Sequence, residues 1–273
     1  MLTQRSRHHL LQRMFWNRRG AALVSRIIGY EQKFDVVVRN YSLIGETNGE
    51  RWLLSLLDNE SLVFDVEFHD GASTRAILTE RPKSRVVGFD PSRFALQSYE
   101  TDLVNDYRVS FENIGLSDKP GTLQFYDYDN MCNSLVPRKE SMDAPIIYTV
   151  QVSTIDNYCR NQSIEHVNFL KIDAEGFDLH VLEGVQEFLS AQGADIFAFE
   201  FASGWSASKR YLWEAAEFFE PLPYGLYHLF NGFLCPLIYD VRIDSSCTLS
   251  AMYVGISHRR LARGDIPLRD YRF

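Results

Sequence analysis

The sequence predicts an α/β fold built on a mostly parallel sheet, and three stretches support this prediction. Residues 62–96 read as an apolar strand that carries Asp65, a turn with Gly71, a helix, and a second apolar strand that ends at Asp90. Residues 166–178 and 195–201 contain two further apolar strands, each with an acid near its carboxyl end. Because strands and helices alternate in this order, the strands are expected to lie parallel, joined by right-handed crossovers.

The remaining elements follow from periodicity and turn residues. In chain order we expect a strand pair at 34–43, helices at 50–57, 73–79 and 91–105, a strand at 107–114, two inserted strands at 123–128 and 148–154, and helices at 179–189 and 209–219. Two or three apolar strands at 225–238 and 248–257 are expected to close the sheet as an antiparallel edge. We divide the chain into an N-terminal extension with lead-in elements (1–58) and a main domain (59–273) that carries an inserted β-hairpin at about 122–154.

The charge is unevenly distributed along the chain. Residues 1–30 contain six arginines and no acid, whereas the whole chain has a net charge of −8. An acidic body argues against nucleic acid as the main partner. The first thirty residues are also amphipathic, which suits contact with an anionic membrane surface or another subunit. A helix packed on its own domain explains the pattern equally well.

The composition and the absence of certain sequence patterns indicate the cellular compartment in which we expect the protein to work. No apolar run approaches the length of a membrane span, and the N-terminus lacks the pattern of a signal peptide. The four cysteines show neither metal-ligand spacing nor a dense disulfide framework. We therefore expect a cytoplasmic protein, with contact to the cytoplasmic membrane face through residues 1–30 as an added option.

The acids at the strand ends predict a nucleoside-binding site. Ligands of parallel sheets bind at the carboxyl ends of the strands, and Asp90 is placed to accept hydrogen bonds from a ribose diol. The glycine-rich turn of dinucleotide-binding proteins is missing, which favours S-adenosylmethionine over a dinucleotide. The simpler alternative is a buried sheet with incidental acids.

A second set of polar residues is expected at the carboxyl ends of the strands in 166–178 and 195–201. Lys171 interrupts an apolar strand and shares a face with Asp173, so a buried ion pair is predicted. This pair can be structural, or it can place Asp173 over the cofactor with Glu175 in the loop beyond. Glu200 reaches the same edge of the sheet from the next strand.

These motifs resemble those of the FkbM family of S-adenosylmethionine-dependent methyltransferases over roughly residues 60–257. The residues that carry the resemblance are Val63-Phe64-Asp65-Val66, Gly88-Phe89-Asp90-Pro91, Leu116-Ser117-Asp118, Thr154-Ile155-Asp156, Phe169-Leu170-Lys171-Ile172-Asp173-Ala174-Glu175-Gly176-Phe177-Asp178 and Phe199-Glu200-Phe201. The resemblance implies a Rossmann-like class I methyltransferase fold, with a mostly parallel seven-stranded sheet and an antiparallel last strand. It also implies methyl transfer to an oxygen, commonly a sugar hydroxyl of a polysaccharide, glycolipid or natural product.

The expected site residues follow from the motifs and the resemblance together. For the cofactor we expect Asp65, Glu67, Phe68, His69, Gly71, Asp90, Ser92, Leu116, Ser117, Asp118 and Asp173. For catalysis we expect Lys171, Asp173, Glu175 and Glu200, with Asp173 or Glu200 as general base, Lys171 tuning Asp173 and Glu175 orienting the substrate. A divalent cation held by Asp173 and Glu200 is an alternative to a base.

The first loop departs from the family pattern at two positions. Glu67 stands where the family has glycine, and His69 stands where it has asparagine. Glycine lets the backbone approach the methionine part of the cofactor, whereas a glutamate adds bulk and charge or binds the cofactor's ammonium. The competing hypotheses are therefore an O-methyltransferase with a glycan or small-molecule acceptor and a methyltransferase-like scaffold subunit. An NAD-dependent oxidoreductase is a third, disfavoured by the missing glycine motif.

Overall fold

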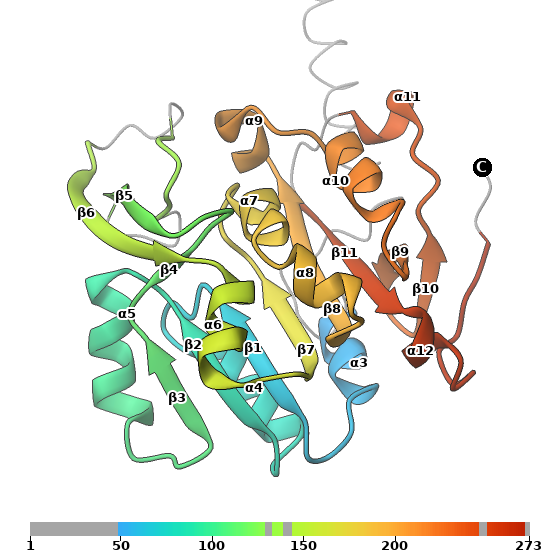
Figure 1. Cartoon of the computed structure of the whole chain (residues 1–273), viewed down its shortest axis with the longest axis horizontal. Coiled ribbons are helices and arrows are strands. Elements are labelled where there is room, and N and C mark those ends of the chain that lie inside the picture. Colours follow the sequence, from blue (N-terminus) through green and yellow to red (C-terminus); the bar gives the residue numbers. More distant parts are fainter. Residues whose placement is uncertain (1–48, 129–132, 139–143, 246–249, 271–273) are drawn as a thin grey trace, which may run out of the picture.

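The computed structural model describes residues 49–128, 133–138, 144–245 and 250–270. The N-terminal basic segment and the strand pair expected at 34–43 lie outside these residues. The described chain forms one eight-stranded sheet with helices on both faces and a separate three-stranded sheet at one side (Figure 1).

The large sheet is mostly parallel, with strand order β10-β9-β11-β8-β7-β1-β2-β3. Its strands are β1 (Leu62–Val66), β2 (Arg85–Phe89), β3 (Val109–Glu112), β7 (Val167–Ile172), β8 (Ala194–Ala202), β9 (Tyr224–Phe230), β10 (Phe233–Pro236) and β11 (Ser250–Ser257). Strands β3, β2, β1, β7 and β8 pair in parallel, and β11 pairs antiparallel with both β8 and β9. The predicted fold class is confirmed, including the antiparallel last strand, β11, which pairs between β8 and β9. One detail differs: strand β10 adds an eighth strand as the outer edge.

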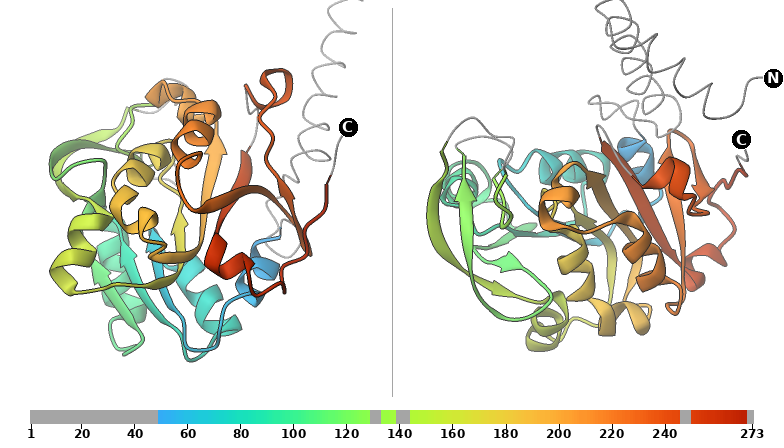
Figure 2. Two further views of the ribbon diagram at one scale, coloured as in Figure 1. Left: turned by 45° about the vertical axis from the view of Figure 1, so that its right-hand side comes forward. Right: turned by 90° about the horizontal axis from the view of Figure 1, so that it is seen from above.

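Helices cover both faces of the large sheet (Figure 2). They are α3 (Glu50–Ser55), α4 (Ala72–Glu80), α5 (Arg93–Ser98), the π-helical turn η1 (Tyr99–Leu103), α6 (Ile155–Gln162), α7 (Asp178–Glu183), α8 (Gln186–Ser190), α9 (Gly204–Ser208), α10 (Leu212–Phe219), α11 (Val241–Asp244) and α12 (His258–Leu261). Side chains alternate along each strand, so Phe64 packs with α6, α7, α8 and α10 on one face, while Val63 packs with α3 and α4 on the other. Across the described ranges, no helix combines the length and the apolar character that a membrane crossing requires.

Several helices differ from the sequence-based expectation. The helix expected from Pro91 begins at Arg93, because the Ser92 side chain caps it by accepting the Ala95 N–H at 3.1 Å. The helix expected over 179–189 is two helices with a break at Gly184, where an added Cβ would lie 2.0 Å from the Ser117 carbonyl oxygen. Helices α6, α9, α11 and α12 were not predicted.

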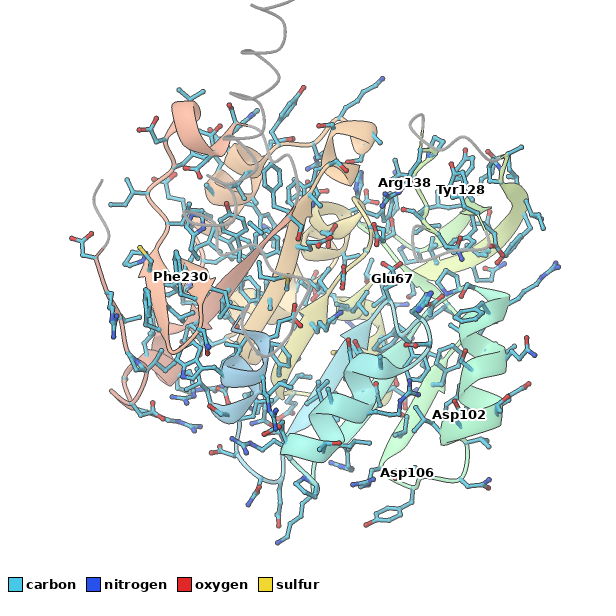
Figure 3. All side chains as sticks on the ribbon, turned by 180° about the vertical axis from the view of Figure 1, so that it is seen from behind. Glu67, Asp102, Asp106, Tyr128, Arg138 and Phe230 are labelled. Carbon is cyan, nitrogen blue, oxygen red and sulfur yellow. The ribbon has the colours of Figure 1, made fainter. Side chains whose placement is uncertain are left out.

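The small sheet interrupts the alternation of strands and helices between β3 and β7. Its strands, in the order β4-β6-β5, are β4 (Gly115–Leu116), β5 (Gly121–Asp127) and β6 (Ile146–Ser153), and β5 pairs antiparallel with β6. Seen from behind, Tyr128 and Arg138 of this region lie near the same end of the large sheet as Glu67, whereas Asp106 lies at the opposite end (Figure 3). Tyr128 and Arg138 therefore lie at the end of the large sheet where the parallel strands have their carboxyl ends.

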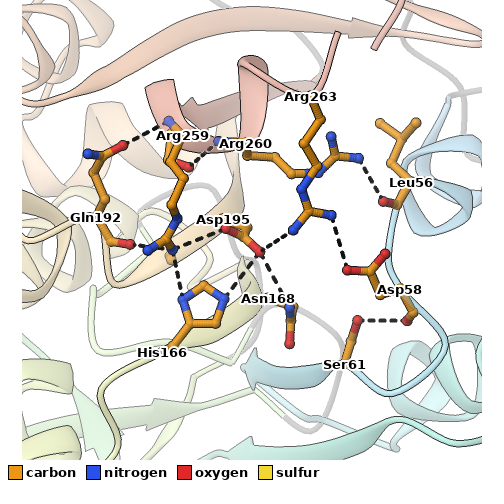
Figure 4. Close-up of polar contacts among 12 residues, drawn as sticks. Leu56, Asp58, Ser61, His166, Asn168, Gln192, Asp195, Arg259, Arg260 and Arg263 are labelled. Carbon is orange, nitrogen blue, oxygen red and sulfur yellow. Dashed lines mark hydrogen bonds and ion pairs between the residues drawn. The ribbon is translucent and has the colours of Figure 1, made fainter. Parts of the chain in front are cut away.

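A polar cluster around Asp195 ties the C-terminal helix α12 to the opposite end of the sheet (Figure 4). The Asp195 carboxylate lies 3.2 Å from His166 Nε2, accepts a hydrogen bond from Arg259 at 3.2 Å and lies 3.8 Å from Arg263. Burial would raise the pKa of Asp195, but hydrogen bonds and charge from His166 and Arg259 outweigh this and hold the pKa below its usual value.

Replacing Asp195 by asparagine is expected to lower the free energy of unfolding at neutral pH by about 1–3 kcal/mol. Because the pKa of Asp195 is lower in the folded state, its stabilising effect is present above the unfolded pKa and is lost as pH falls through the folded pKa. The deficit of the variant should therefore shrink below about pH 4. Urea unfolding at several pH values measures this deficit.

Asp58→Asn is the matched control, because Asp58 also pairs with Arg263 but its side chain is 63% exposed. We expect its free energy of unfolding to change by less than about 0.5 kcal/mol. Equal losses in the two variants would contradict the assignment.

Candidate functional site

The loop that follows β1 forms the base of the candidate site. Glu67, His69 and Gly71 have φ angles of 66°, 51° and 77°, so the chain enters the left-handed region at every second residue. Between them, the Phe68 side chain is 1% exposed and packs on Gly88, where an added Cβ would lie 2.4 Å from the Phe68 ring. The buried ring thus holds the loop against β2 while the neighbouring side chains project on the other side.

Backbone hydrogen bonds hold this loop in an unfavourable conformation. A left-handed residue with a Cβ costs about 1–2 kcal/mol. The N–H groups of Glu67 and Phe68 donate to the Phe89 carbonyl oxygen at 2.9 and 3.2 Å, and the His69 N–H donates to the Asp90 carboxylate at 2.9 Å. Positions 67 and 69 therefore keep a backbone that favours glycine, although neither residue is glycine.

Asp90 follows the end of β2 and faces the space above the loop. It is 3% exposed, and its two oxygens accept the N–H groups of Ser92 at 2.7 Å and His69 at 2.9 Å. Burial raises the pKa of Asp90, and these hydrogen bonds oppose the rise. A carboxylate has about four acceptor positions, so each oxygen keeps capacity for a further donor such as a ribose hydroxyl.

Two cavities meet at Glu67 and His69. The first has a mainly apolar lining from Pro91, Leu116, Phe125, Phe177 and Val181, with Asp90 and Ser92 at its side. The second carries the polar side chains of Asp70, Ser73, Lys171, Asp173 and Glu175, together with Phe68. Both are lined by Glu67 and His69. The site thus has an apolar half and a charged half.

A buried ion pair lies beneath the charged half. Lys171 Nζ lies 2.9 Å from the Asp173 carboxylate and 4.0 Å from the Asp65 carboxylate. Asp65 is fully buried and accepts a hydrogen bond from Thr74 at 2.7 Å. Burial raises the pKa of Asp65 to about 6, against the lowering effect of Lys171. Asp65 therefore provides a second carboxyl group beside Lys171 and does not line either cavity.

The turn after β7 carries Glu175 into the second cavity. The buried Asp178 carboxylate shapes this turn by accepting the N–H groups of Ala174 at 3.0 Å and Gly176 at 3.1 Å. Gly176 has a φ of 95°, and an added Cβ there would lie 2.4 Å from the backbone of Gly204. Close backbone contact with the start of α9 thus requires glycine at this position.

Glu175 forms an ion pair with Arg138, a residue of the segment between β5 and β6. The two side chains are 23% and 11% exposed, respectively. Burial raises the pKa of Glu175 to about 7, because the neighbouring Asp173 and Asp178 add to the rise and Arg138 only partly offsets it. Glu175 is therefore poised to exchange a proton near neutral pH.

Further contacts fix the segment 133–138 over the site. Ser134 Oγ donates to the Glu175 carbonyl oxygen at 3.1 Å, and the Arg138 N–H donates to Tyr128 Oη at 2.7 Å. Asn133 accepts the Tyr128 N–H at 2.7 Å and also lines the first cavity. Arg138 could not be predicted from the sequence, because its partner Glu175 is 37 residues away.

Besides Asp65, four other predicted residues do not line the two cavities. Gly71 precedes α4, and Ser117 is buried with its hydroxyl donating to Asp118 at 2.8 Å. Glu200 lies near the end of β8, bonded to Ser250, and burial together with Asp173 and Glu175 raises its pKa well above its usual value. The charges of Asp173 and Glu175 therefore act on Glu200, although its side chain does not line either cavity.

The donor set fits S-adenosylmethionine. Asp90 suits the ribose diol, the apolar cavity suits adenine, and the charged cavity offers Lys171 and Asp173 to the polar methionine moiety. Within the described ranges, no group of three or more His, Cys, Asp or Glu side chains is arranged to hold a metal ion. The alternative of a catalytic divalent cation therefore has no support.

Comparisons with known proteins agree with this reading. The model of the methyltransferase FkbM domain matches residues 65–226. The 2-O-methyltransferase NoeI of Sinorhizobium fredii is 24% identical over 157 residues, which is 51% of this chain and 64% of that protein. The chain thus covers less than two thirds of the length of this relative.

Solved structures with a similar arrangement include a methyltransferase FkbM from Methylobacillus flagellatus, with 16% identity, a TM-score of 0.47, and coverage of 72% of this chain and 44% of that one. Another is SMU.1697c, a putative methyltransferase from Streptococcus mutans in complex with SAH, with 11% identity, a TM-score of 0.45, and coverage of 76% and 95%. The family match spans more than half of the described fold and includes the loop after β1, Asp90 and the turn after β7. The chain belongs to the FkbM family of methyltransferases.

Proposed function

We propose that this methyltransferase uses S-adenosylmethionine to methylate a hydroxyl group of a sugar. The observation that carries the proposal is a pair of neighbouring cavities that share Glu67 and His69 as lining residues, one apolar with Asp90 beside it and one charged with Asp173 in it. The printed name of the relative NoeI, a 2-O-methyltransferase, supports an oxygen acceptor.

The chain's own residues would position the acceptor and move its proton. When bound, S-adenosylmethionine supplies a methyl group activated by the sulfonium charge. An acceptor hydroxyl that reaches the charged cavity beside the methionine moiety can donate a hydrogen bond to Asp173, because Lys171 binds one oxygen of this carboxylate at 2.9 Å and leaves the other to accept. Glu175, with its pKa near 7, is better matched than Glu200 to take the proton of that hydroxyl, because Glu200 does not line the cavity.

The competing hypothesis, a methyltransferase-like scaffold, is favoured by one observation. Glu67 has a buried carboxylate oxygen, Oε2, on a left-handed backbone in the loop that should hold the cofactor. If this side chain filled the cofactor site, the protein would retain the fold without the activity.

Titration calorimetry with S-adenosylmethionine separates the two hypotheses. We expect binding with a dissociation constant in the micromolar range, followed by methylation of an oligosaccharide acceptor detected by mass spectrometry. NAD serves as the control ligand and should not bind. A folded protein that binds no S-adenosylmethionine at millimolar concentration would favour the scaffold.

A further inference from the structure

The Glu67 side chain lies at the junction of the two cavities, and one of its carboxylate oxygens lacks a hydrogen-bond donor. It lines both cavities, and its Oε2 atom is buried with no hydrogen-bond partner among the described residues. A buried carboxylate oxygen without a donor is costly. The strained backbone at this position adds to that cost. Both costs would be offset by a ligand that donates hydrogen bonds to this oxygen.

The surroundings of Glu67 specify the charge of such a ligand. Glu175, Asp173, Asp90 and Asp178 all lie close enough to raise its pKa, after the larger effect of burial. The cations nearby are engaged elsewhere, since Lys171 pairs with Asp173 and Asp65 and Arg138 pairs with Glu175. His69 also faces the junction. The group that completes the site should therefore be a cation.

We propose that Glu67 binds the α-ammonium group of the cofactor's methionine moiety. This inference rests on the proposed use of S-adenosylmethionine. An ammonium group has three N–H donors for the orphaned oxygen, whereas the sulfonium has none. With the nucleoside in the apolar cavity, the amino-acid end extends past the junction into the charged cavity. Glu67 thus supplies by its side chain a contact that a glycine at this position cannot make.

The same geometry predicts that cofactor binding is coupled to proton release. Burial and the neighbouring acids hold the pKa of Glu67 well above its usual value in the empty protein. A cation at this position lowers the pKa of the carboxyl, so the fraction of Glu67 that is protonated in the empty protein would release its proton to solvent as the carboxylate pairs with the ammonium. The wild type and the variants compared below share all other titratable groups near this region, so a difference in proton release between them reports on Glu67. These groups are Asp65, His69, Asp90, Asp173, Glu175, Asp178 and Glu200.

Calorimetry with three ligands tests the proposal without relying on turnover. S-adenosylhomocysteine carries the ammonium but no sulfonium, S-adenosylmethionine carries both, and 5′-methylthioadenosine carries neither. For Glu67→Gln we expect a loss of roughly 10- to 100-fold in affinity for the first two ligands and a change of less than about twofold for the third. Titrations in buffers of different ionisation enthalpy should show proton release in the wild type and a smaller release in the variant.

Two further variants sharpen the comparison. Glu112→Gln is the matched control, because Glu112 ends strand β3 of the same sheet, accepts a hydrogen bond from Tyr158 at 3.1 Å and lines neither cavity, so all three affinities should stay unchanged. Glu67→Gly relieves the backbone strain, which should raise the melting temperature, and it should still lose affinity for the ligands that carry the ammonium.

The possible failures are distinguishable. If the wild type binds none of the three ligands, the proposed function itself is wrong and the inference falls with it. If the wild type binds and Glu67→Gln binds equally well, only the inference is overturned. Tighter binding of all ligands by Glu67→Gly would show that Glu67 obstructs the site, and a loss confined to S-adenosylmethionine would assign the contact to the sulfonium.

Discussion

Replacement of Asp90 by alanine is expected to weaken binding of S-adenosylmethionine by about 100-fold or more. Two hydrogen bonds from a ribose diol to a buried carboxylate contribute about 1.5–3 kcal/mol each when the acceptor is charged. The same carboxylate accepts the N–H groups of His69 at 2.9 Å and Ser92 at 2.7 Å. The substitution therefore also loosens the loop that bears Glu67. Titration calorimetry measures the loss, and thermal unfolding shows whether the variant remains folded.

Asp106 offers a matched control for Asp90. Its carboxylate also accepts the backbone N–H two residues further on, that of Arg108, at 3.0 Å, but it lies at the opposite end of the sheet (Figure 3). Asp106→Ala should leave cofactor affinity unchanged. The role of the diol is isolated by comparing adenosine with 2′,3′-dideoxyadenosine. The wild type should prefer adenosine, and Asp90→Ala should bind the two alike. If the variant kept the preference, another residue would hold the ribose.

Replacement of Glu175 by glutamine is expected to lower turnover by about 10²- to 10⁴-fold while leaving cofactor affinity nearly unchanged. Glutamine keeps the size of the side chain and an acceptor for Arg138, but it cannot take a proton. In the wild type, kcat/KM should rise about tenfold per pH unit below pH 7 and level off above it, because the pKa of Glu175 is about 7 and the base must be ionised to act. This rise should be absent in the variant.

Glu183→Gln is the control for the ion pair as such. Glu183 pairs with Arg210 at the end of α7, outside both cavities, and the exposed fractions of the two side chains are 33% and 19%. Its variant should keep both turnover and the pH profile. A pH profile that survives in Glu175→Gln would instead point to Asp173 or Glu200, the two bases expected from the sequence.

The sequence alone was sufficient for the features that depend on local period and chain order. Alternation of strands and helices predicted the parallel sheet, and the acids at strand ends placed Asp90 and Asp173 at the edge where the cavities form. The period of two along β7 predicted that Lys171 and Asp173 would share a face, and their charged groups lie 2.9 Å apart. The family motifs correctly identified the methyltransferase family. All of these signals lie within a few residues of one another.

Other features were decided only by contacts between distant parts of the chain. Nothing near Arg138 marks it as the partner of Glu175, and nothing near Glu200 shows that it faces Ser250 rather than a cavity. The sequence showed that Glu67 replaces the glycine of the family pattern. Its inferred role, however, depends on the position of its unpaired Oε2 atom at the junction of the two cavities. Sequence periodicity determines which way a side chain points from its own element. Packing between elements determines what that side chain meets, and therefore which acid is shielded, paired or left open to a ligand.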